Sequence, residues 1–191
     1  MRAVAPLLAL LPALAGCAPG GDGGGGGAAP QDGPAAIALE PCPEQPDREA
    51  GGAETLPPLV LECPGGGTLD LGRAPGVPAV VNLWASWCGP CREELPLVQQ
   101  LADVAGDRLA VVGVISRDGE EQAGSFAADA GATFPSAFDG EGELMTELGL
   151  NGLPYTYFLD ADGGIAFVQV GPVDSLAELE GLVAEHLGVQ L

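Results

Sequence analysis

The stretch NLWASWCGPCREELP, residues 82–96, places two cysteines three positions apart where an apolar run gives way to a helical pattern. The segment AVVNLWA that leads into it is almost continuously apolar, which is typical of a strand buried on both faces. From residue 88 to residue 105 the apolar side chains recur at helical spacing, and Gly106 supplies a C-terminal stop. The sequence therefore predicts a buried strand followed by a helix that starts at the two cysteines.

This location favours redox chemistry at Cys88 and Cys91. The first turn of a helix carries unpaired N–H groups and partial positive charge, so a thiolate there is stabilised and its pKa falls below the free value of about 8.5. Residues three apart share a helix face, so both sulfurs can meet. We expect Cys88, at the exposed end, to attack a partner disulfide and Cys91, one turn inward, to resolve the mixed disulfide. Part of a zinc site and a purely structural disulfide are the alternatives.

The rest of the chain alternates strands and helices. Strands are predicted in 56–63, 65–71, 108–116, 133–139, 155–160 and 165–171, and helices in 119–131, 142–149 and 175–188. Early strands separated by helices imply parallel pairing, whereas the ADGG turn at 161–164 predicts an antiparallel hairpin. Ser175 and Glu178 form a capping-box pattern at the start of the final helix, and Gly188 closes it. We therefore expect an α/β fold with a central mixed sheet and helices on both faces.

The first 36 residues are expected to lie outside the folded part. Residues 1–16 have one Arg and a short apolar run, which indicates a signal peptide, because a membrane span needs roughly 20 apolar residues. Their end, LAGC, resembles the lipobox of bacterial lipoproteins and implies lipidation at Cys17; an ordinary signal peptide that contains a cysteine is the alternative. Residues 17–36 are rich in Gly, Ala and Pro and predict a flexible, lipid-anchored linker. The remainder divides into an irregular extension, 37–72, and a domain, 73–191.

Charge and composition exclude several functions. The chain has 191 residues, a formal net charge of −21 and no Lys, which argues against binding to nucleic acid, where neutralisation of phosphates drives affinity. We expect no metal and no cofactor beyond a Cys88–Cys91 disulfide, because one His and, apart from Met1, one Met leave few imidazole or soft ligands. His186, in the last turn of the final helix, is assigned no chemistry. The protein is expected to be a monomer.

Cys42 and Cys63 each precede a Pro in a loop-rich part of the extension. A structural disulfide between them is predicted, and closing a loop of ~20 residues contributes about 3 kcal/mol in the chain-entropy model. A second redox pair that exchanges electrons with Cys88 and Cys91 is the rival interpretation. It is disfavoured because neither cysteine of the extension has a helix N-terminus to activate it.

The segment VVNLWASWCGPCREELP resembles the active-site segment of the thioredoxin superfamily, and more narrowly that of the TlpA/ResA-like extracytoplasmic thiol–disulfide oxidoreductases. The resemblance covers roughly residues 67–188 and implies a thioredoxin fold. Trp84 and Trp87 match the aromatic residues that flank the family's site. Pro96 matches the proline that kinks the active-site helix, in a position where proline is otherwise unfavourable.

The segment GLPYTYFLD resembles the one in which this family places a cis-proline opposite the cysteines. Pro154 is therefore expected to be cis and to join the catalytic residues. The Leu153 backbone N–H and C=O would then pair with an extended substrate segment as a short added strand. The substrate-binding residues that the resemblance implies are Trp87, Gly89, Pro90 and Leu153.

One position departs from thioredoxin proper, which has a buried Asp in the strand before the motif where this chain has Asn82. TlpA-like proteins often carry an acid three residues after the second cysteine, and Glu94 fills that position. Because Glu94 shares a helix face with Cys91, we hypothesise that a pKa raised by partial burial lets it move the proton on or off Cys91. The alternative is a solvated Glu in the first helical turn without a chemical role.

The resemblance implies a protein thiol–disulfide oxidoreductase, lipid-anchored to the cell membrane on its extracytoplasmic side, that acts on disulfide-containing exported proteins. Reduction is the expected direction, because a Gly-Pro dipeptide between the cysteines goes with a low potential, about −270 mV in thioredoxin. A membrane thiol-electron donor would keep the pair reduced, and cytochrome c apoprotein is the family's best-known client. A redoxin-like thiol peroxidase, a cysteine-based metal-binding lipoprotein and an oxidase are the alternatives.

Overall fold

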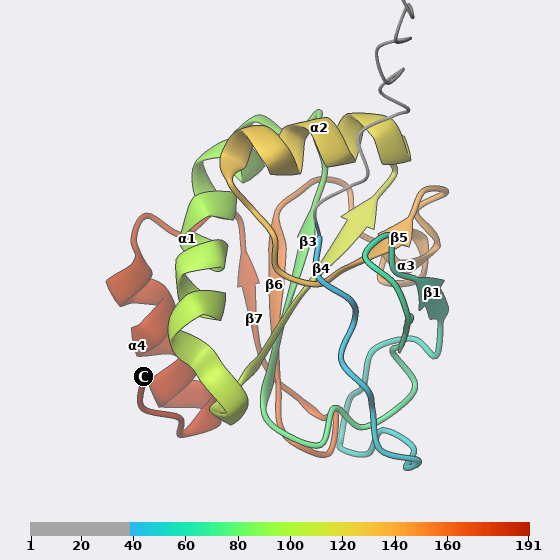
Figure 1. Ribbon diagram of the computed structural model, residues 1–191. Coiled ribbons are helices and arrows are strands. Elements are labelled where there is room, and N and C mark those ends of the chain that lie inside the picture. Colours follow the sequence, from blue (N-terminus) through green and yellow to red (C-terminus); the bar gives the residue numbers. More distant parts are fainter. Residues whose placement is uncertain (1–38) are drawn as a thin grey trace, which may run out of the picture. The chain divides into compact units, whose positions relative to one another are not determined.

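The central strand, β3 (Ala79–Trp84), has all six residues buried in the computed structural model. β4 (Ala110–Ser116) pairs with β3 in parallel, and β6 (Tyr155–Leu159) pairs with it antiparallel. At the edges, β5 (Ser136–Asp139) runs parallel to β4 and β7 (Ile165–Val170) runs antiparallel to β6. The order β5-β4-β3-β6-β7 is the mixed sheet predicted from the sequence, with its antiparallel hairpin at the end (Figure 1).

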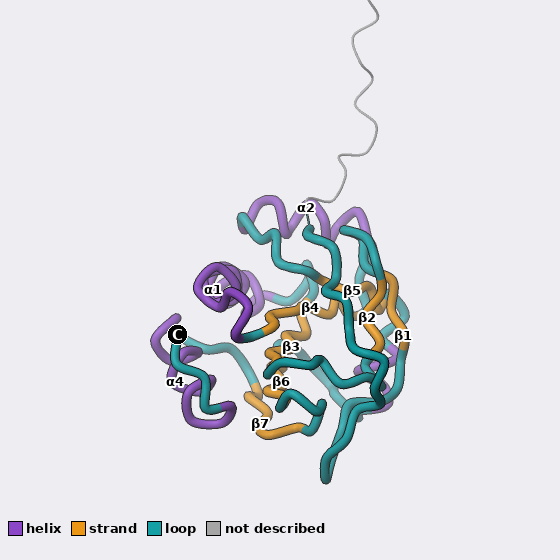
Figure 2. Tube along the Cα trace, turned by 60° about the horizontal axis from the view of Figure 1, so that its bottom comes forward, coloured by secondary structure: helices purple, strands orange, loops and turns teal. Residues whose placement is uncertain are grey.

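Helices cover one face of this sheet. α1 (Gly89–Ala105), continued by the short 3-10 turn η1 (Gly106–Arg108), packs beside α4 (Leu176–Leu187), as Figure 2 shows. α2 (Glu120–Ala130) connects β4 to β5 and adds Phe126 to the same core. The largest buried side chains of this core are Trp84, Leu95, Leu101, Ile115, Phe134, Phe158 and Leu179. Burying each of them stabilises the fold by about 1.5–3 kcal/mol. Packing on this face of the sheet therefore holds α1 in position.

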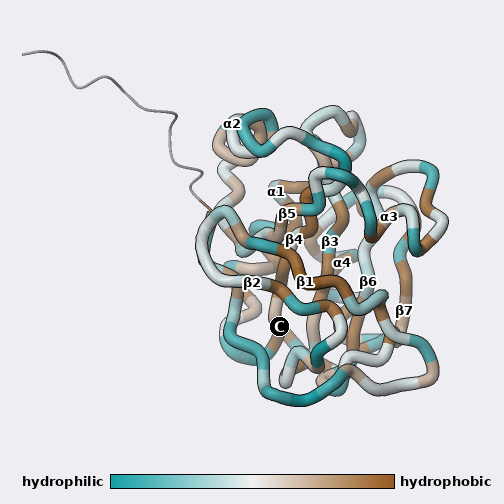
Figure 3. The backbone as a smooth tube through the Cα atoms, turned by 90° about the vertical axis from the view of Figure 1, so that its right-hand side faces the viewer, coloured by the Kyte–Doolittle hydropathy of each residue, from teal (hydrophilic) through white to brown (hydrophobic). Residues whose placement is uncertain are grey.

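The opposite face is covered mainly by the extension, with one short helix of the domain beside it. Among the described residues it carries the short α3 (Glu143–Glu147) and the antiparallel pair β1 (Val60–Glu62) and β2 (Thr68–Asp70). The many prolines of the extension exclude helices, so apolar side chains reach the sheet from loops and short strands. The extension residues in this core are Cys42, Leu56, Leu61, Cys63, Leu69 and Leu71, whereas Leu39 belongs to the core under α1. Figure 3 shows hydrophobic residues along β1 and along the central strands behind it.

The ends of α4 agree with the capping residues predicted from the sequence, with one difference. Ser175 Oγ accepts a hydrogen bond from Glu178 N at 3.2 Å, and Gly188 ends the helix with a left-handed φ of 68°. The carboxylate of Glu178 accepts from Asp174 N at 2.9 Å rather than from Ser175 N. The cap therefore satisfies two N–H groups, as a capping box does, but reaches one residue further back.

The structure describes residues 39–191. The predicted signal peptide (1–16), the linker (17–36) and the lipidation residue Cys17 lie outside this range. Within 39–191, none of the helices combines the length and the apolar character needed to cross a bilayer.

Candidate functional site

Cys88 forms the N-cap of α1, directly after β3. Its side chain accepts a hydrogen bond from Cys91 N at 3.2 Å, and its own backbone is extended, with φ −82° and ψ 108°. The two sulfurs are joined in a disulfide, with the Cα atoms 5.3 Å apart. Pro90 lies in the first turn, where its missing N–H leaves no helical hydrogen bond unmade. Cys88 thus lies at the end of α1 where the backbone N–H groups are unpaired and partial positive charge accumulates.

The burial of the pair differs from the sequence expectation. Cys88 was expected at the exposed end, but in the disulfide form it is only 3% exposed, close to the 1% of Cys91. Its sulfur is bonded to Cys91 and accepts the Cys91 N–H, which turns it toward its own helix and away from solvent. The exposed side chain beside it is Trp87, at 54%.

The loop before α1 is fastened to the turn after β4. Asp118 accepts hydrogen bonds from Ser86 N at 2.5 Å and from Ser86 Oγ at 2.9 Å. Trp87 Nε1 donates to the carbonyl oxygen of Arg117 at 2.8 Å, and Arg92 donates to the Ser86 carbonyl at 3.0 Å. The sequence analysis missed Ser86 and Asp118. Their positions could have indicated this contact, because Ser86 and Asp118 follow two neighbouring parallel strands, and the loops after such strands meet at one edge of the sheet.

Glu94 is 1% exposed, so it is not the solvated side chain of the alternative interpretation. Its Oε2 accepts from Asn82 Nδ2 at 3.1 Å, and its Oε1 accepts from Val173 N at 3.3 Å. Burial raises the pKa of Glu94 from 4.5 to about 7, although both hydrogen bonds favour the charged form, and Glu178 of α4 raises it slightly further. A carboxyl group with this pKa can accept and release a proton near neutral pH.

Asn82 connects Glu94 to a residue that the sequence analysis did not identify. Besides Glu94, Asn82 Nδ2 donates to Thr156 Oγ1 at 2.9 Å, and both side chains are fully buried. The two residues are paired directly across β3 and β6. Within the described part of the chain, the Asn82 Oδ1 atom is buried without a hydrogen-bond partner. A Thr on a strand carries no sequence signal of such a role; only the strand register reveals it.

The Leu153–Pro154 peptide bond is cis, as the resemblance implies. Because Leu83 of β3 pairs with Tyr155, Pro154 lies beside the end of β3 that leads to the cysteines. The Pro154 carbonyl accepts from Gly171 N at 3.1 Å, while Leu153 is half-buried. The structure therefore brings the 153–154 segment to the same edge of the sheet as the N-terminus of α1.

Cys42 and Cys63 form the second disulfide, with their Cα atoms 6.1 Å apart. Backbone hydrogen bonds of 2.9 and 3.0 Å tie both cysteines to the turn at 66–67. This pair belongs to the core under the extension, whereas Cys88 and Cys91 belong to the core under α1. The sheet separates the two disulfides.

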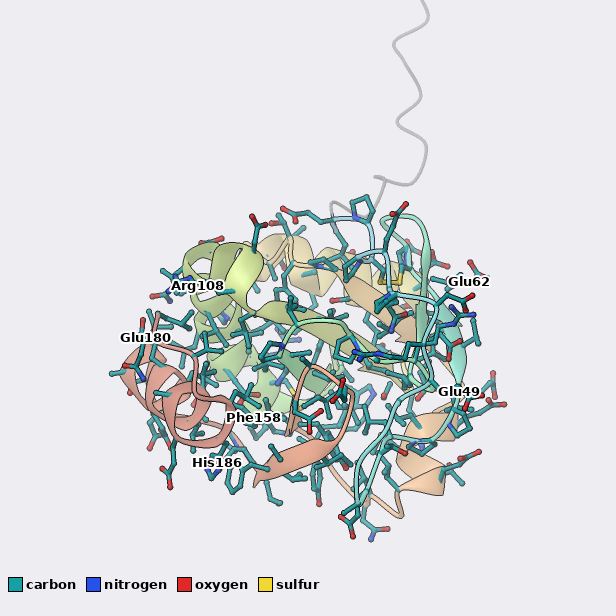
Figure 4. The ribbon with its side chains drawn as sticks, turned by 90° about the horizontal axis from the view of Figure 1, so that it is seen from below. Glu49, Glu62, Arg108, Phe158, Glu180 and His186 are labelled. Carbon is teal, nitrogen blue, oxygen red and sulfur yellow. A yellow bond between two sulfur atoms is a disulfide. The ribbon has the colours of Figure 1, made fainter. Side chains whose placement is uncertain are left out.

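The remaining predicted or candidate features lie apart from the cysteines of α1. The ring of His186 stacks on Phe167 with centroids 4.0 Å apart, and Figure 4 shows it beside Phe158. Within residues 39–191, no group of three or more His, Cys, Asp or Glu side chains is arranged to hold a metal ion. A largely apolar cavity of about 390 Å³ lies between the extension and the sheet, lined by residues such as Pro46, Leu71 and Val81. No cysteine lines it, so it is not part of the redox site.

Comparisons with known proteins identify the family of this chain. Residues 51–183 match the family profile described as Redoxin. The thioredoxin-like protein YneN of Bacillus subtilis is 35% identical over 121 residues, which cover 62% of this chain and 71% of that protein. The thiol:disulfide interchange protein CycY of Rhizobium leguminosarum is 35% identical over 105 residues, which cover 54% of this chain and 55% of that protein. The chain thus spans between about half and about seven tenths of the length of these curated relatives.

Two solved structures are similar over most of their length, each with a TM-score of 0.59. A putative thiol:disulfide interchange protein DsbE from Chlorobium tepidum is 28% identical and covers 71% of this chain and 94% of its own. A secreted disulfide oxidoreductase of Mycobacterium tuberculosis is 25% identical and covers 67% of this chain and 96% of its own. These similarities confirm the thioredoxin fold expected from the sequence.

Proposed function

Because this chain belongs to the redoxin family, as a TlpA/ResA-like thiol–disulfide oxidoreductase of the thioredoxin superfamily, we propose that it reduces disulfides of exported proteins outside the cytoplasm through Cys88 and Cys91. The observation that carries the proposal is the N-cap position of Cys88, with Cys91 bonded to it one turn along α1. The buried carboxyl group of Glu94 in the next turn of the same helix supports it.

The reaction transfers two electrons from the dithiol to the client, and the two client thiolates that are released take their protons from water. The Cys88 thiolate attacks one sulfur of the client disulfide; a Cys88–client S–S bond forms and the client S–S bond breaks, releasing a thiolate that takes a proton. Cys91 then loses its proton and attacks Cys88, which releases the second client thiol and leaves the Cys88–Cys91 disulfide. A membrane-bound dithiol donor returns the two electrons. The unpaired N–H groups of α1 stabilise the Cys88 thiolate when it attacks the client and again when reduction by the donor releases it.

Glu94 is proposed to hold the proton that Cys91 must lose. Cys91 and Glu94 are three residues apart on α1 and both are buried, so water has little access to either. The pKa of Glu94, about 7, is close to the pH at which the exchange takes place, and such a pKa suits a general base. After resolution the same group would return the proton when the donor reduces the pair.

Client recognition is proposed to use the exposed surface around the pair. Trp87 offers a large, half-exposed ring beside Cys88. Gly89 and Pro90 leave the start of α1 without bulky side chains, and the Leu153 backbone would pair with an extended client segment. Cytochrome c apoprotein, whose haem-attachment cysteines must be reduced, is the client class that we propose first.

The location is proposed from the N-terminal sequence. A signal peptide at 1–16, lipidation of Cys17 and a linker at 17–36 would tether the folded part at the outer face of the membrane. The similarity to a secreted disulfide oxidoreductase supports an extracytoplasmic setting. Incorporation of a fatty-acid analogue into the protein, and its loss in Cys17→Ser, tests the anchor.

The experiment that tests the reaction is a trapping assay with Cys91→Ala. This variant can attack but cannot resolve, so it should accumulate a mixed disulfide on Cys88 with a peptide that contains an internal disulfide. The wild-type protein should instead release the reduced peptide, and Cys88→Ala should form no adduct. If the Cys91→Ala protein forms no adduct under these conditions, the proposed reaction is wrong.

Thiol peroxidase activity is the second candidate, favoured by the match of residues 51–183 to the Redoxin profile. In that reaction Cys88 would reduce a peroxide, forming a sulfenic acid that Cys91 converts to the observed disulfide. Hydrogen peroxide consumption at the expense of a dithiol distinguishes the two functions. We expect peptide disulfide reduction to be the faster reaction.

A further inference from the structure

The carboxyl group of Glu94 is surrounded by hydrogen-bond donors. Its Oε1 faces Val173 N and its Oε2 faces Asn82 Nδ2. This arrangement suits the carboxylate, which accepts only. A protonated Glu94 carries one O–H donor and needs an acceptor, which neither of these two partners offers as they now lie.

Only one of the two partners can change from donor to acceptor. The Val173 N–H belongs to the backbone and is fixed, whereas the side-chain amide of Asn82 carries an oxygen and a nitrogen of similar geometry. We propose that Asn82 is a positioning residue whose side-chain amide inverts when Glu94 changes protonation state. Nδ2 donates to the carboxylate, and after a half-turn of the amide Oδ1 accepts the proton of the neutral acid.

Thr156 makes the inversion compatible with the buried surroundings. Its hydroxyl accepts from Asn82 Nδ2 in the observed orientation, at 2.9 Å, and by rotating can donate to Oδ1 in the inverted one. Among the described residues the buried Oδ1 of Asn82 has no partner, so the inversion breaks no hydrogen bond at that end. It places the two Nδ2 hydrogens there without an acceptor, a cost that the hydrogen bonds donated to Oδ1 by neutral Glu94 and by Thr156 must offset. An amide fastened at both ends would be locked; this one is fastened only on the side of Glu94 and Thr156.

Among the groups around Glu94, Asn82 is the one whose side chain can become a hydrogen-bond acceptor for the neutral acid. Within residues 39–191, β3 and β6 present Asn82 and Thr156, neither of which titrates, and the segment before α4 presents the Val173 N–H. α4 contributes the carboxylate of Glu178, which disfavours a charged Glu94 from a distance, and α1 contributes Cys91. The inference rests on the proposed function for its purpose: an acid that stays hydrogen-bonded in both states can exchange a proton with Cys91 without being left unpaired.

The sequence offers a direct way to observe the inversion. Asn82 and Asn151 are the only two asparagines in the chain, so labelling with ¹⁵N-asparagine yields two pairs of side-chain NH₂ signals in the full-length protein, one pair for each residue. Asn82 is buried and Asn151 is exposed, which makes Asn151 an internal control. We expect the NH₂ protons of Asn82 to show contacts with the γ-methylene protons of Glu94 at high pH and to lose them at low pH, with a midpoint near pH 7. The signal of Asn151 should not change in this range.

Two variants separate an inverting amide from a static one. In Glu94→Gln the partner cannot titrate, so the contacts of Asn82 should be independent of pH. Thr156→Val removes the hydroxyl but keeps the shape. In the charged-state orientation it takes away the acceptor of one Nδ2 hydrogen, whereas in the inverted orientation it takes away only one of the two donors to Oδ1. We therefore expect the midpoint to move upward by about half a unit. Contacts of Asn82 that stay unchanged while the Glu94 carboxyl signal titrates would show a fixed amide and overturn the inference.

The inference and the proposed function fail in different measurements. The amide contacts are read by NMR on the oxidised protein, without a client. A protein that inverts its amide but forms no mixed disulfide in the trapping assay would retain the inference as a property of the fold and lose the function. A protein that reduces its client with a fixed amide would retain the function alone.

Discussion

The two disulfides of residues 39–191 lie on opposite faces of one sheet and differ in loop length, in their position relative to a helix and in their neighbouring groups. Cys88 and Cys91 are separated by three positions and lie at the N-terminus of α1, beside the buried Glu94. Cys42 and Cys63 are separated by 21 positions and are held in a loop region by backbone hydrogen bonds, with no helix start beside either. Both pairs are nearly inaccessible in the oxidised form. The comparison teaches that burial alone does not distinguish a redox pair from a structural one.

Loop length and electrostatics make that distinction. In the chain-entropy model, a link across 21 positions stabilises by about 3 kcal/mol and a link across three by about 2 kcal/mol, so the extension pair contributes more to stability. Only the pair at α1 has unpaired N–H groups to favour a thiolate. We therefore expect removal of Cys88 and Cys91 to abolish exchange, and removal of Cys42 and Cys63 to lower the stability of the fold.

The largest effect should come from Cys88→Ser. Because the attacking thiolate is lost, reduction of a peptide disulfide should fall by roughly a thousandfold or more. The double variant Cys42→Ser/Cys63→Ser is the control, and its rate in the folded state should equal that of the wild type. If the double variant loses exchange as completely as Cys88→Ser does, the extension pair takes part in the reaction.

The same double variant should show the second largest effect, on stability. Removing the link between Cys42 and Cys63 should lower the free energy of unfolding by about 3 kcal/mol, because the unfolded chain regains the entropy of an open loop. Urea denaturation of the oxidised proteins measures this difference. A loss below about 1 kcal/mol would mean that packing of the extension on the sheet does not depend on the link.

Glu94→Gln should change the pH dependence of stability. The pKa of Glu94 is raised from 4.5 to about 7, so the stability that its protonated form contributes is complete below pH 4.5 and is lost as the pH rises through 7. Gln cannot ionise, so from pH 4.5 to about pH 8 the wild type should lose on the order of 3 kcal/mol relative to the variant.

Urea denaturation at several pH values measures this difference, with Glu93→Gln, an exposed neighbour, as the matched control. The pH profile of Cys91 alkylation in the reduced protein provides the mechanistic readout. If Glu94→Gln leaves the pH profile of Cys91 alkylation unchanged, the carboxyl group of Glu94 takes no part in the exchange reaction.

A smaller effect is expected from Asp118→Ala. The carboxylate holds Ser86 N and Ser86 Oγ, so its loss should loosen the loop that leads to Cys88 and slow exchange by about fivefold, equivalent to about 1 kcal/mol. Asp129→Ala removes the same charge from the exposed surface of α2 and should leave the rate unchanged. Equal rates for the two variants would show that the loop holds its position without Asp118.

The smallest effect should come from Arg48→Ala in the extension. Arg48 pairs with Asp162 at 2.7 Å, but the side chains are 53% and 68% exposed. Solvent and salt screen such a pair, so the free energy of unfolding should change by less than about 1 kcal/mol. A larger loss, comparable to that of the double cysteine variant, would show that ion pairs hold the extension as strongly as the covalent link does.

Much of the fold follows from local sequence patterns. The apolar run at 79–85, the helical spacing after Cys88 and the turn at 161–164 predict elements that the structure places within a few residues of their expected bounds. These patterns succeed because strand burial, helical periodicity and turn chemistry depend on neighbours in the chain. The cover of the second face could not be predicted in this way, since the extension packs through scattered leucines without a period.

The sequence by itself determined the chemistry available: two cysteines at a helix start, an acid three residues further on, and a second cysteine pair far away. The tertiary structure alone decided how deeply Glu94 is buried, that Thr156 lies opposite Asn82, and that Asp118 anchors Ser86. The physical reason is that a pKa and a hydrogen-bond network depend on desolvation and on register between strands distant in sequence. Neither quantity is encoded in the residues on either side of a position.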